Sequence, residues 1–246
     1  MLYPIRIRFA LLAVAVAFPF MIYGACGDSH EGNAVMFRDD FKTLDNWVAW
    51  EFDRVDRPSK YEIVEKAGRS VLRMESIGGG SGLIGQEHLR AEEGLSLRWR
   101  WRADRLPEVS DPLRRSGDDF AARIYVIFEQ DEDEAGWLER WALRNAPFRD
   151  EGILPERGIA YALTDHTGLP DHYPNPYSSR VVMFPVTLDE SETGEWQDAE
   201  SNPVADYRKA FADAPPERFR LAIMCDSDDS DSRSLAWLDF IEIRVH

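Results

Sequence analysis

The amino-acid sequence predicts an all-β protein, a sandwich of two antiparallel sheets with one or two short helices. From Val35 onward, short segments rich in β-branched and aromatic residues alternate with turn residues. The clearest segment, Leu95–Ala103, places two leucines and two tryptophans on one face and three arginines on the other. This period of two is typical of a half-buried strand. Because 44% of the residues are hydrophobic, the chain can also build the core that such a fold requires.

Nine segments carry the strand pattern. They are Trp47–Phe52, Tyr61–Glu65, Ser70–Glu75, Leu95–Ala103, Phe120–Glu129, Ile159–Thr164, Arg180–Val186, Phe219–Cys225 and Leu235–Val245. In the fifth segment, alternate residues from Phe120 to Phe128 form the core face, and Arg123 and Tyr125 lie opposite. If this segment pairs with Leu95–Ala103, arginines and a tyrosine line one sheet surface.

One helix is expected near the end of the chain. Asn202 takes the N-cap and Pro203 the first helical position, ahead of apolar residues at i, i+3 and i+7 (Val204, Tyr207 and Phe211). The charged segment Asp131–Asp150 is either a second helix or a folded insertion. The run Gly78–Gly82 is expected to be a flexible turn, and it lacks the Lys and Ser/Thr of a phosphate loop.

The first 25 residues have the layout of a secretory signal: basic Arg6 and Arg8, an apolar run, and small residues before Cys26. Small residues before a cysteine resemble the lipobox of bacterial lipoproteins. Three alternatives follow: lipidation of Cys26, ordinary cleavage and release, or an uncleaved anchor. The protein is expected to be exported, as a periplasmic or outer-membrane lipoprotein or as a secreted protein, and to touch a membrane only through such a lipid. Residues 26–35 are expected to be a flexible mature N-terminus, and residues 36–246 a single β-sandwich domain.

Charge and cysteine content exclude some classes of partner and site. Acidic residues outnumber basic ones by 45 to 29, which argues against a nucleic-acid partner. Cys225 is in phase with Phe219, Leu221 and Ile223, so it is expected to be a buried thiol; a disulfide with Cys26 is the alternative. No Cys/His spacing suits zinc.

Several separated motifs resemble a known family of exported bacterial proteins. They are Leu97–Trp101, Asp118–Val126, the Ala205-Asp206-Tyr207 helix and Ile223–Asp229, in that order. They resemble the family catalogued as domain of unknown function 3047, over about residues 36–246. The resemblance implies a jelly-roll-like sandwich similar to carbohydrate-binding modules and brings no established activity. Ser201 stands where the family pattern leads us to expect an arginine, so no role is carried over to that position.

The loop from Asp226 to Asp231 is the candidate metal site. Its oxygen-bearing side chains suit a structural calcium ion, with Asp226, Asp228, Asp229 and Asp231 as ligands. It is not an EF-hand, because position six is Asp231 instead of Gly and position twelve is Trp237 instead of Glu. A solvated connection between two strands is the alternative, and no other cofactor is expected.

The candidate ligand-binding residues lie on two predicted strands: Arg98, Arg100, Asp118, Asp119, Arg123 and Tyr125. One of the paired aspartates is expected to bind an arginine of the neighbouring strand. Guanidinium groups match carboxylate and sulfate oxygens, so the arginine face suits an anionic sugar. A face laced with ion pairs of little energetic value is the alternative reading.

Three functions compete at this stage. The leading one is non-catalytic binding of a carbohydrate or another cell-envelope ligand. A polysaccharide lyase or glycoside hydrolase is the second, and a lyase requires His166 or His172 to reach the arginine face. A purely structural envelope protein is the third.

Overall fold

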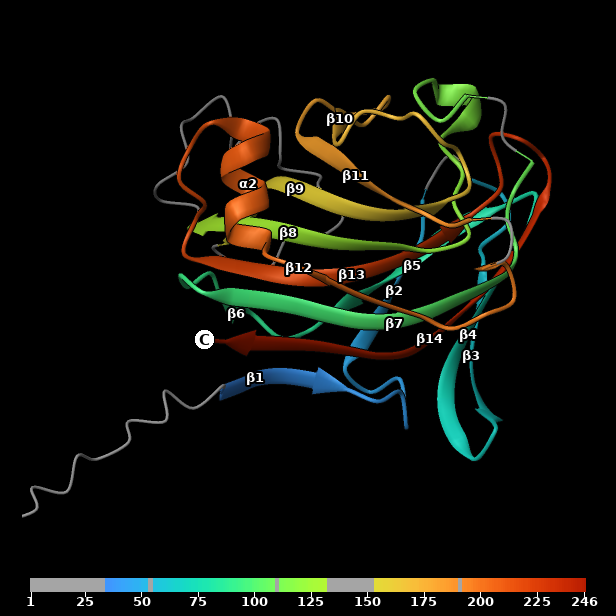
Figure 1. Ribbon diagram of the computed structural model, residues 1–246, viewed down its shortest axis with the longest axis horizontal. Coiled ribbons are helices and arrows are strands. Elements are labelled where there is room, and N and C mark those ends of the chain that lie inside the picture. The colour runs from blue at the N-terminus through green and yellow to red at the C-terminus, as the bar shows by residue number, and fades with distance from the viewer. Residues whose placement is uncertain (1–33, 53–54, 109–110, 132–152, 190–191) are drawn as a thin grey trace, which may run out of the picture. The chain divides into compact units, whose positions relative to one another are not determined.

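The strands form two sheets that pack face to face (Figure 1). The computed structural model describes residues 34–52, 55–108, 111–131, 153–189 and 192–246. One sheet has the order β12-β7-β14-β4-β3, and β1 pairs with β14 beyond the end of β4. Its strands are β1 (Ala34–Asp39), β3 (Lys60–Lys66), β4 (Arg69–Ile77), β7 (Leu95–Arg105), β12 (Gln197–Ser201) and β14 (Arg233–Val245). We call it the six-stranded sheet.

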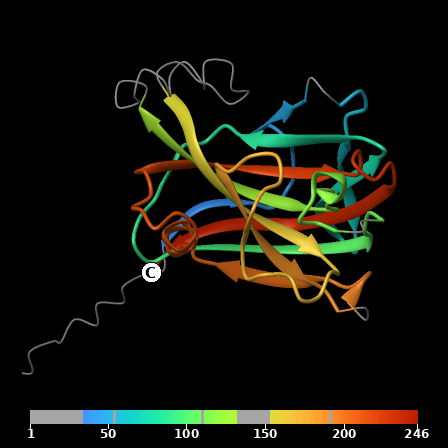
Figure 2. The ribbon, with the colours of Figure 1, turned by 90° about the horizontal axis from the view of Figure 1, so that it is seen from above.

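The second, eight-stranded sheet has the order β10-β11-β9-β8-β13-β5-β2, with β6 beside β13. Its strands are β2 (Trp47–Trp50), β5 (Gly80–Gly85), β6 (Leu89–Arg90), β8 (Arg123–Asp131), β9 (Ile153–Thr164), β10 (Tyr173–Pro174), β11 (Val181–Thr187) and β13 (Arg218–Asp226). Seen from above, β8 and β9 are inclined to β7 and β14, as expected for packed twisted sheets (Figure 2).

The predicted all-β sandwich is confirmed, with one parallel pair inside it. β11 runs parallel to β9, whereas the other strand pairs of the described residues are antiparallel. A parallel neighbour needs a long crossover, and residues 165–180 supply it. The crossover places residues beside one end of β8.

The core lies between the sheets, on the faces that the alternation predicts. Trp99 and Trp101 of β7 are at most 1% exposed, and so are the two leucines before them. Their indole rings meet edge to face, 5.3 Å between centroids. Trp99 also lies 5.1 Å from the ring of Tyr161, which comes from β9 in the other sheet. Aromatic pairs of this kind add to the burial energy that holds the layers together.

The two arginine-bearing strands do not pair, so the condition for one shared arginine surface is not met. β7 pairs with β12 and β14, whereas β8 pairs with β9 and β13. Both core faces point inward, so Arg98 and Arg100 point outward from the six-stranded sheet and Arg123 and Tyr125 outward from the eight-stranded one. Alternation tells which residues of one strand share a face, but it does not tell which strands are neighbours. The predicted continuous arginine face therefore does not exist.

The structure also corrects two predictions about single segments. β8 begins at Arg123, and Phe120, expected on the core face, packs with Tyr125 and Met224 in an apolar cluster on the opposite side of the sheet. The expected glycine turn is partly a strand, because Gly80 and Gly82 belong to β5. A Cβ on Gly82 would lie 2.7 Å from Cε3 of Trp50. Glycine is required there because the indole ring lies directly against the backbone of β5.

The expected helix is confirmed as α2 (Pro203–Phe211). The Asn202 side chain accepts a hydrogen bond of 2.9 Å from the backbone N–H of Ala205, which caps the first turn. Tyr207 is fully buried, with its ring 4.5 Å from that of Phe128. α2 thus covers one end of β8 and β9 (Figure 1). Within the described residues, a 3-10 turn, Arg115–Gly117, is the other helical element.

Several expectations fall outside the described residues: the signal segment 1–25, Cys26 and its lipid, and nearly all of the insertion Asp131–Asp150. The expected flexible segment 26–35 also lies there, except Ala34 and Val35, which begin β1. Cys225 is a free, buried thiol, as expected. Among the described residues, no helix is long and apolar enough to cross a membrane.

Candidate functional site

Most of the predicted site residues meet where β8 begins and β13 ends. The two strands are antiparallel neighbours, with Met224 opposite Arg123, so the residues before β8 lie beside those after β13. This juxtaposition gathers four aspartates around one arginine. We call Asp118, Asp119, Asp226, Asp228 and Arg123 the carboxylate cluster.

Arg123 is the centre of the cluster and is 1% exposed. Its Nη1 donates a hydrogen bond of 3.2 Å to Asp118, and its Nη2 donates to Asp226. The guanidinium also lies 5.1 Å from the ring centroid of Phe120 and 5.7 Å from that of Tyr125. An aspartate–arginine pair was expected between neighbouring strands. Asp118 instead pairs with the strand that follows it in sequence, and Asp226 is the partner from the neighbouring strand.

The other carboxylates fasten loops to the sheet. Asp119 is 2% exposed and accepts the backbone N–H groups of Asp229 at 3.1 Å and Ser230 at 2.6 Å. The Asn175 amide donates a hydrogen bond of 2.8 Å to Asp118, which ties down the crossover 165–180. Neither aspartate is therefore a free acid or base.

Burial raises the pKa of two carboxyl groups in the cluster, Asp118 and Asp226. It raises the pKa of Asp226 well above its ordinary value, and Arg123 offsets that rise only in part. The pKa of Asp118 is raised for the same reason, against the opposing effects of Arg123 and Asn175. Asp229 is raised to a pKa of about 6 by burial and by the neighbouring carboxylates, although the Tyr177 hydroxyl opposes the shift. Burial thus favours the protonated form of these carboxyl groups, and Arg123 favours the ionised form of Asp118 and Asp226.

Three of these carboxylates have the geometry of an oxygen-ligand set. Asp119, Asp226 and Asp228 each offer an oxygen within 4.8 Å of the others. A Cβ on Gly80 would lie 2.7 Å from Oδ1 of Asp228, so glycine leaves room for that carboxylate. Hard cations such as Ca²⁺ prefer ligands of this type. The sequence named Asp226 and Asp228 but missed Asp119, which comes from a distant segment.

The remaining predicted metal ligands have other contacts. Asp229 accepts the hydroxyl of Tyr177. Asp231 has left-handed backbone geometry, with φ of 48°, and its Oδ1 lies 2.4 Å from where a Cβ on Gly78 would be. Asp229 and Asp231 do not belong to the group of three close carboxylates, and a calcium ion at this loop stays a prediction.

Toward solvent, the cluster ends in an aromatic ring that sequence reasoning missed. Tyr177 is 49% exposed, and the Arg115 guanidinium lies 5.1 Å from its ring centroid. Arg115 also donates a hydrogen bond of 3.1 Å to the carbonyl of Pro176. We call Arg115, Tyr177, Asp228 and Asp229 the rim. The available signal was an aromatic residue at the end of a proline-rich crossover.

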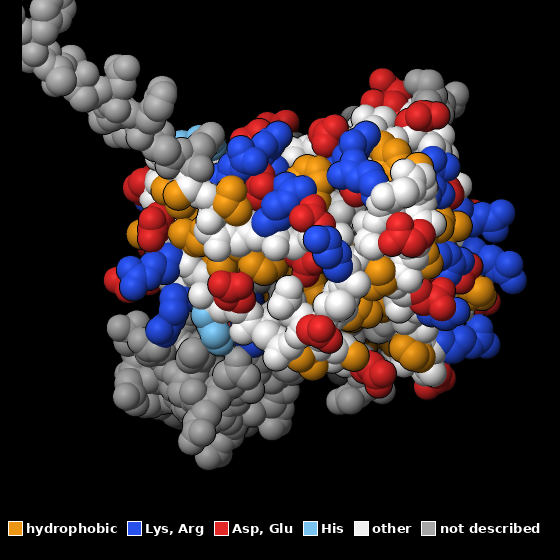
Figure 3. Space-filling model, turned by 90° about the horizontal axis from the view of Figure 1, so that it is seen from below, with side chains coloured by type: hydrophobic (Ala, Val, Ile, Leu, Met, Phe, Trp, Pro, Cys, Tyr) orange, Lys and Arg blue, Asp and Glu red, His pale blue; other side chains and the backbone are white. Residues whose placement is uncertain are grey.

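Arg98 and Arg100 lie elsewhere, on the outer face of the six-stranded sheet. Arg98 lies 3.5 Å from Glu200 and 3.7 Å from Glu242. Arg100 lies 4.0 Å from Asp239, and Arg102 is paired with Asp104. Seen from the side of β1 and β14, basic and acidic side chains are interspersed (Figure 3). We call this array the ion-pair ladder, and it matches the alternative reading of these arginines.

The two loop histidines, His166 and His172, lie in different surroundings. His166 lines a small hollow together with Asp119 and Phe120. The His172 ring stacks on Phe184, with 5.5 Å between centroids. Of the two, His166 is thus the one that borders the cluster.

Comparisons with solved structures give low-identity likenesses to all-β domains. A Family 30 carbohydrate-binding module of a Clostridium thermocellum cellulosomal cellulase is 12% identical, with a TM-score of 0.41 over 86% of this chain and 96% of that one. The Family 11 carbohydrate-binding module of Clostridium thermocellum, in complex with a β-1,3-1,4-mixed-linked tetrasaccharide, is 11% identical, with a TM-score of 0.40 over 84% and 92%.

A further likeness is the K1 cleaved adhesin domain of Lys-gingipain from Porphyromonas gingivalis W83, 12% identical, with a TM-score of 0.38 over 85% and 98%. No curated protein matches the chain. One family does match, over residues 45–242, which include the whole carboxylate cluster and both sheets except β1 and the end of β14. The chain therefore belongs to the protein family of unknown function DUF3047.

Proposed function

We propose that this protein is a non-catalytic binding module that holds a carbohydrate, or another cell-envelope ligand, at the rim. The observation that carries the proposal is Tyr177, a half-exposed ring beside a guanidinium and above two partly exposed carboxylates. Binding sites combine apolar and aromatic surface with a few fixed polar groups. A sugar ring offers both an apolar C–H face and hydroxyl groups to such a surface.

The rim is supported by a rigid base. Asp119 fixes the backbone at Asp229 and Ser230, and Asn175 receives the backbone N–H of Tyr177 at 2.9 Å while its own amide binds Asp118. A binding site whose loops are held this way loses little conformational entropy when a ligand binds. The buried charges thus serve to position the exposed ones.

A glycan array, probed with and without calcium, tests the proposal. Replacement Tyr177→Ala is expected to weaken binding at least about tenfold, equivalent to about 1.4 kcal/mol, because it removes the ring. Replacement Tyr177→Phe keeps the ring and is expected to retain most of the binding. Val48→Ala, which trims a side chain that is 50% exposed on β2, is the control. Equal binding by the wild type and Tyr177→Ala would place the ligand elsewhere.

The same experiment separates the other two functions. Uronate polymers are included and the ultraviolet absorbance of the products is followed, because a lyase leaves an unsaturated sugar. New absorbance that is lost in His166→Ala favours the lyase. No binding and no turnover by a well-folded sample favours a structural envelope protein.

Export is part of the proposal and has its own test. The basic, apolar and small segments before Cys26 support cleavage near that residue. Mass spectrometry of the mature N-terminus in a bacterial host is expected to show a chain that starts near residue 26. A lipid-modified Cys26 identifies the anchored form and an unmodified terminus the released form. An intact Met1 in the isolated protein contradicts cleavage.

A further inference from the structure

Two arginines at one end of the six-stranded sheet differ from those of the ladder. Arg105 ends β7 and Arg233 begins β14. Neither makes an ion pair or a side-chain hydrogen bond within the described part of the chain, whereas Arg98, Arg100 and Arg102 all have carboxylate partners. Both side chains are exposed, in a protein with a net charge of −16.

Strand register brings these two arginines together. Arg105 lies opposite Leu235, and Arg233 is two residues before Leu235 on the same strand. Directly opposed residues and their diagonal neighbours share a face, at separations of about 7–8 Å that long side chains can bridge. Both guanidinium groups can therefore contact one ligand.

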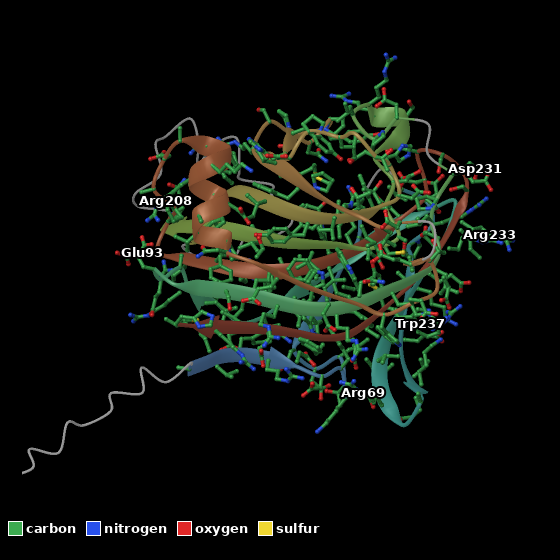
Figure 4. The ribbon with its side chains drawn as sticks, viewed as in Figure 1. Arg69, Glu93, Arg208, Asp231, Arg233 and Trp237 are labelled. Atoms are coloured by element: carbon green, nitrogen blue, oxygen red, sulfur yellow. The ribbon has the colours of Figure 1, made fainter. Side chains whose placement is uncertain are left out.

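The arginines line a depression of about 400 Å³. This is within the range of about 300–1,000 Å³ of typical ligand pockets. Its wall includes the hydroxyl-bearing Ser230 and Ser232 and the apolar Ile77, which is 46% exposed. Figure 4 shows Arg233 and Asp231 projecting at this end of the molecule, opposite the end that carries Glu93 and Arg208.

Two carboxylates also line the depression, and neither neutralises the arginines. Asp231 lies against Gly78, where a Cβ would lie 2.4 Å from its Oδ1. Nη1 of a further arginine, Arg57, is 3.3 Å from the same position. Glu108 is exposed, and its backbone N–H donates to Ser232. The lining thus holds two guanidinium groups and two carboxylates, and the Arg57 guanidinium lies beside it at Gly78.

We propose that this depression binds the carboxylate or sulfate group of an acidic saccharide. This deepens the proposed function, on which it rests, by naming the ligand class. A guanidinium fork matches the oxygens of either anion, and a sugar ring attached to it meets Ile77. The loop after β13 joins the two sites, since Asp229 belongs to the rim and Asp231 to the depression. One oligosaccharide can then contact both.

Affinity electrophoresis tests this inference with three polymers: polygalacturonate (carboxylate), dextran sulfate (sulfate) and dextran (neutral). Migration is compared with a gel that lacks polymer, which removes the effect of the protein's own charge. The wild type is expected to be retarded by an acidic polymer and not by dextran. Retardation by polygalacturonate identifies a carboxylate ligand, and retardation by dextran sulfate identifies a sulfate ligand. Retardation is expected to weaken with added salt, because the screening length falls from about 10 Å at 0.1 M to about 3 Å at 1 M.

The double variant Arg105→Gln/Arg233→Gln is expected to bind the acidic polymer at least about tenfold more weakly. Arg90→Gln makes the same kind of charge change on β6, in the other sheet, and is expected to bind like the wild type. Unchanged melting temperatures show that all of these variants fold.

Three outcomes overturn the inference. Wild-type binding in the double variant, or equal loss in Arg90→Gln, places the anion elsewhere. No retardation by either acidic polymer, while neutral glycans still bind through Tyr177, overturns the inference and leaves the proposed function standing. No binding of any glycan overturns both.

Discussion

The ion-pair ladder and the carboxylate cluster contain the same chemical groups in opposite surroundings. In the ladder, Arg98 is 39% exposed at its side chain and contacts the exposed Glu200 and the buried Glu242, which Arg38 and Arg244 also bind. In the cluster, Arg123 is 2% exposed at its side chain and lies between carboxylates that are also buried. Water reaches the arginines of the ladder but is excluded from Arg123, so removal of an arginine is expected to cost more in the cluster.

The largest expected effect is that of Arg123→Met. It leaves Asp118 and Asp226 buried without their cation, and breaking a buried pair in this way costs about 3–5 kcal/mol. Urea unfolding followed by circular dichroism measures the free energy of unfolding. The double variant Arg123→Met/Asp226→Asn is expected to recover part of the loss because it also removes one buried charge. A cost below about 1 kcal/mol for Arg123→Met would make the cluster equivalent to the ladder.

A smaller effect is expected from pH, through Asp229. Its pKa in the folded protein, about 6, is above the ordinary value of 3.8, so the folded state binds this proton more tightly than the unfolded state. Its contribution to stability is therefore fully present below about pH 4 and is lost as the pH rises through 6. The variant Asp229→Asn lacks this titration. We expect its melting temperature to rise relative to the wild type between pH 4 and pH 7.

The matched control for this experiment is Asp198→Asn on the exposed ladder, where the carboxylate lies 3.9 Å from Arg100. It reports the general effect of removing one negative charge from an acidic protein. For each variant, the difference in melting temperature from the wild type is plotted against pH. The same curve for Asp229→Asn and Asp198→Asn would contradict a raised pKa of Asp229.

The smallest expected effect is that of Arg98→Ala. Exposed ion pairs contribute about 0–1 kcal/mol, and Glu242 keeps its hydrogen bonds to Arg38 and Arg244 when Arg98 is removed. Urea unfolding at low and high salt checks this, with a smaller cost at high salt. A cost comparable to that of Arg123→Met would mean that the ladder is an integrated network and that exposure does not separate the two regions.

Local patterns predicted much of the secondary structure and little of the strand order. The alternation in β7 and the cap at Asn202 are confirmed because both depend on neighbouring residues in the sequence. Whether β7 and β8 pair could not be decided from the sequence, because packing over the whole domain selects neighbouring strands, and the two strands lie in different sheets. β5 was missed because its glycines mimic a turn, whereas they make room for Trp50 and Asp228.

The candidate site shows the same division. The sequence identified several charged residues next to predicted strands as candidate site residues: Asp118, Asp119, Arg123 and the loop from Asp226. Such clusters of charge beside strands are unusual. Their meeting point was not visible, because it depends on β8 and β13 being neighbours. Tyr177 reaches the rim only through the crossover that the parallel pair β9 and β11 requires, where it meets Arg115 from the turn before β8.

By itself the sequence determined the all-β class, the inward faces of the strands, the capped helix and the acidic character of the chain. These follow from side-chain periodicity and composition, which act over a few residues. Only the tertiary structure decided which arginines are neutralised, which carboxylates are buried together and which guanidinium groups are left for a ligand. The reason is physical: the strength of a charge interaction depends on burial and distance, and both are set by contacts between segments far apart in the chain.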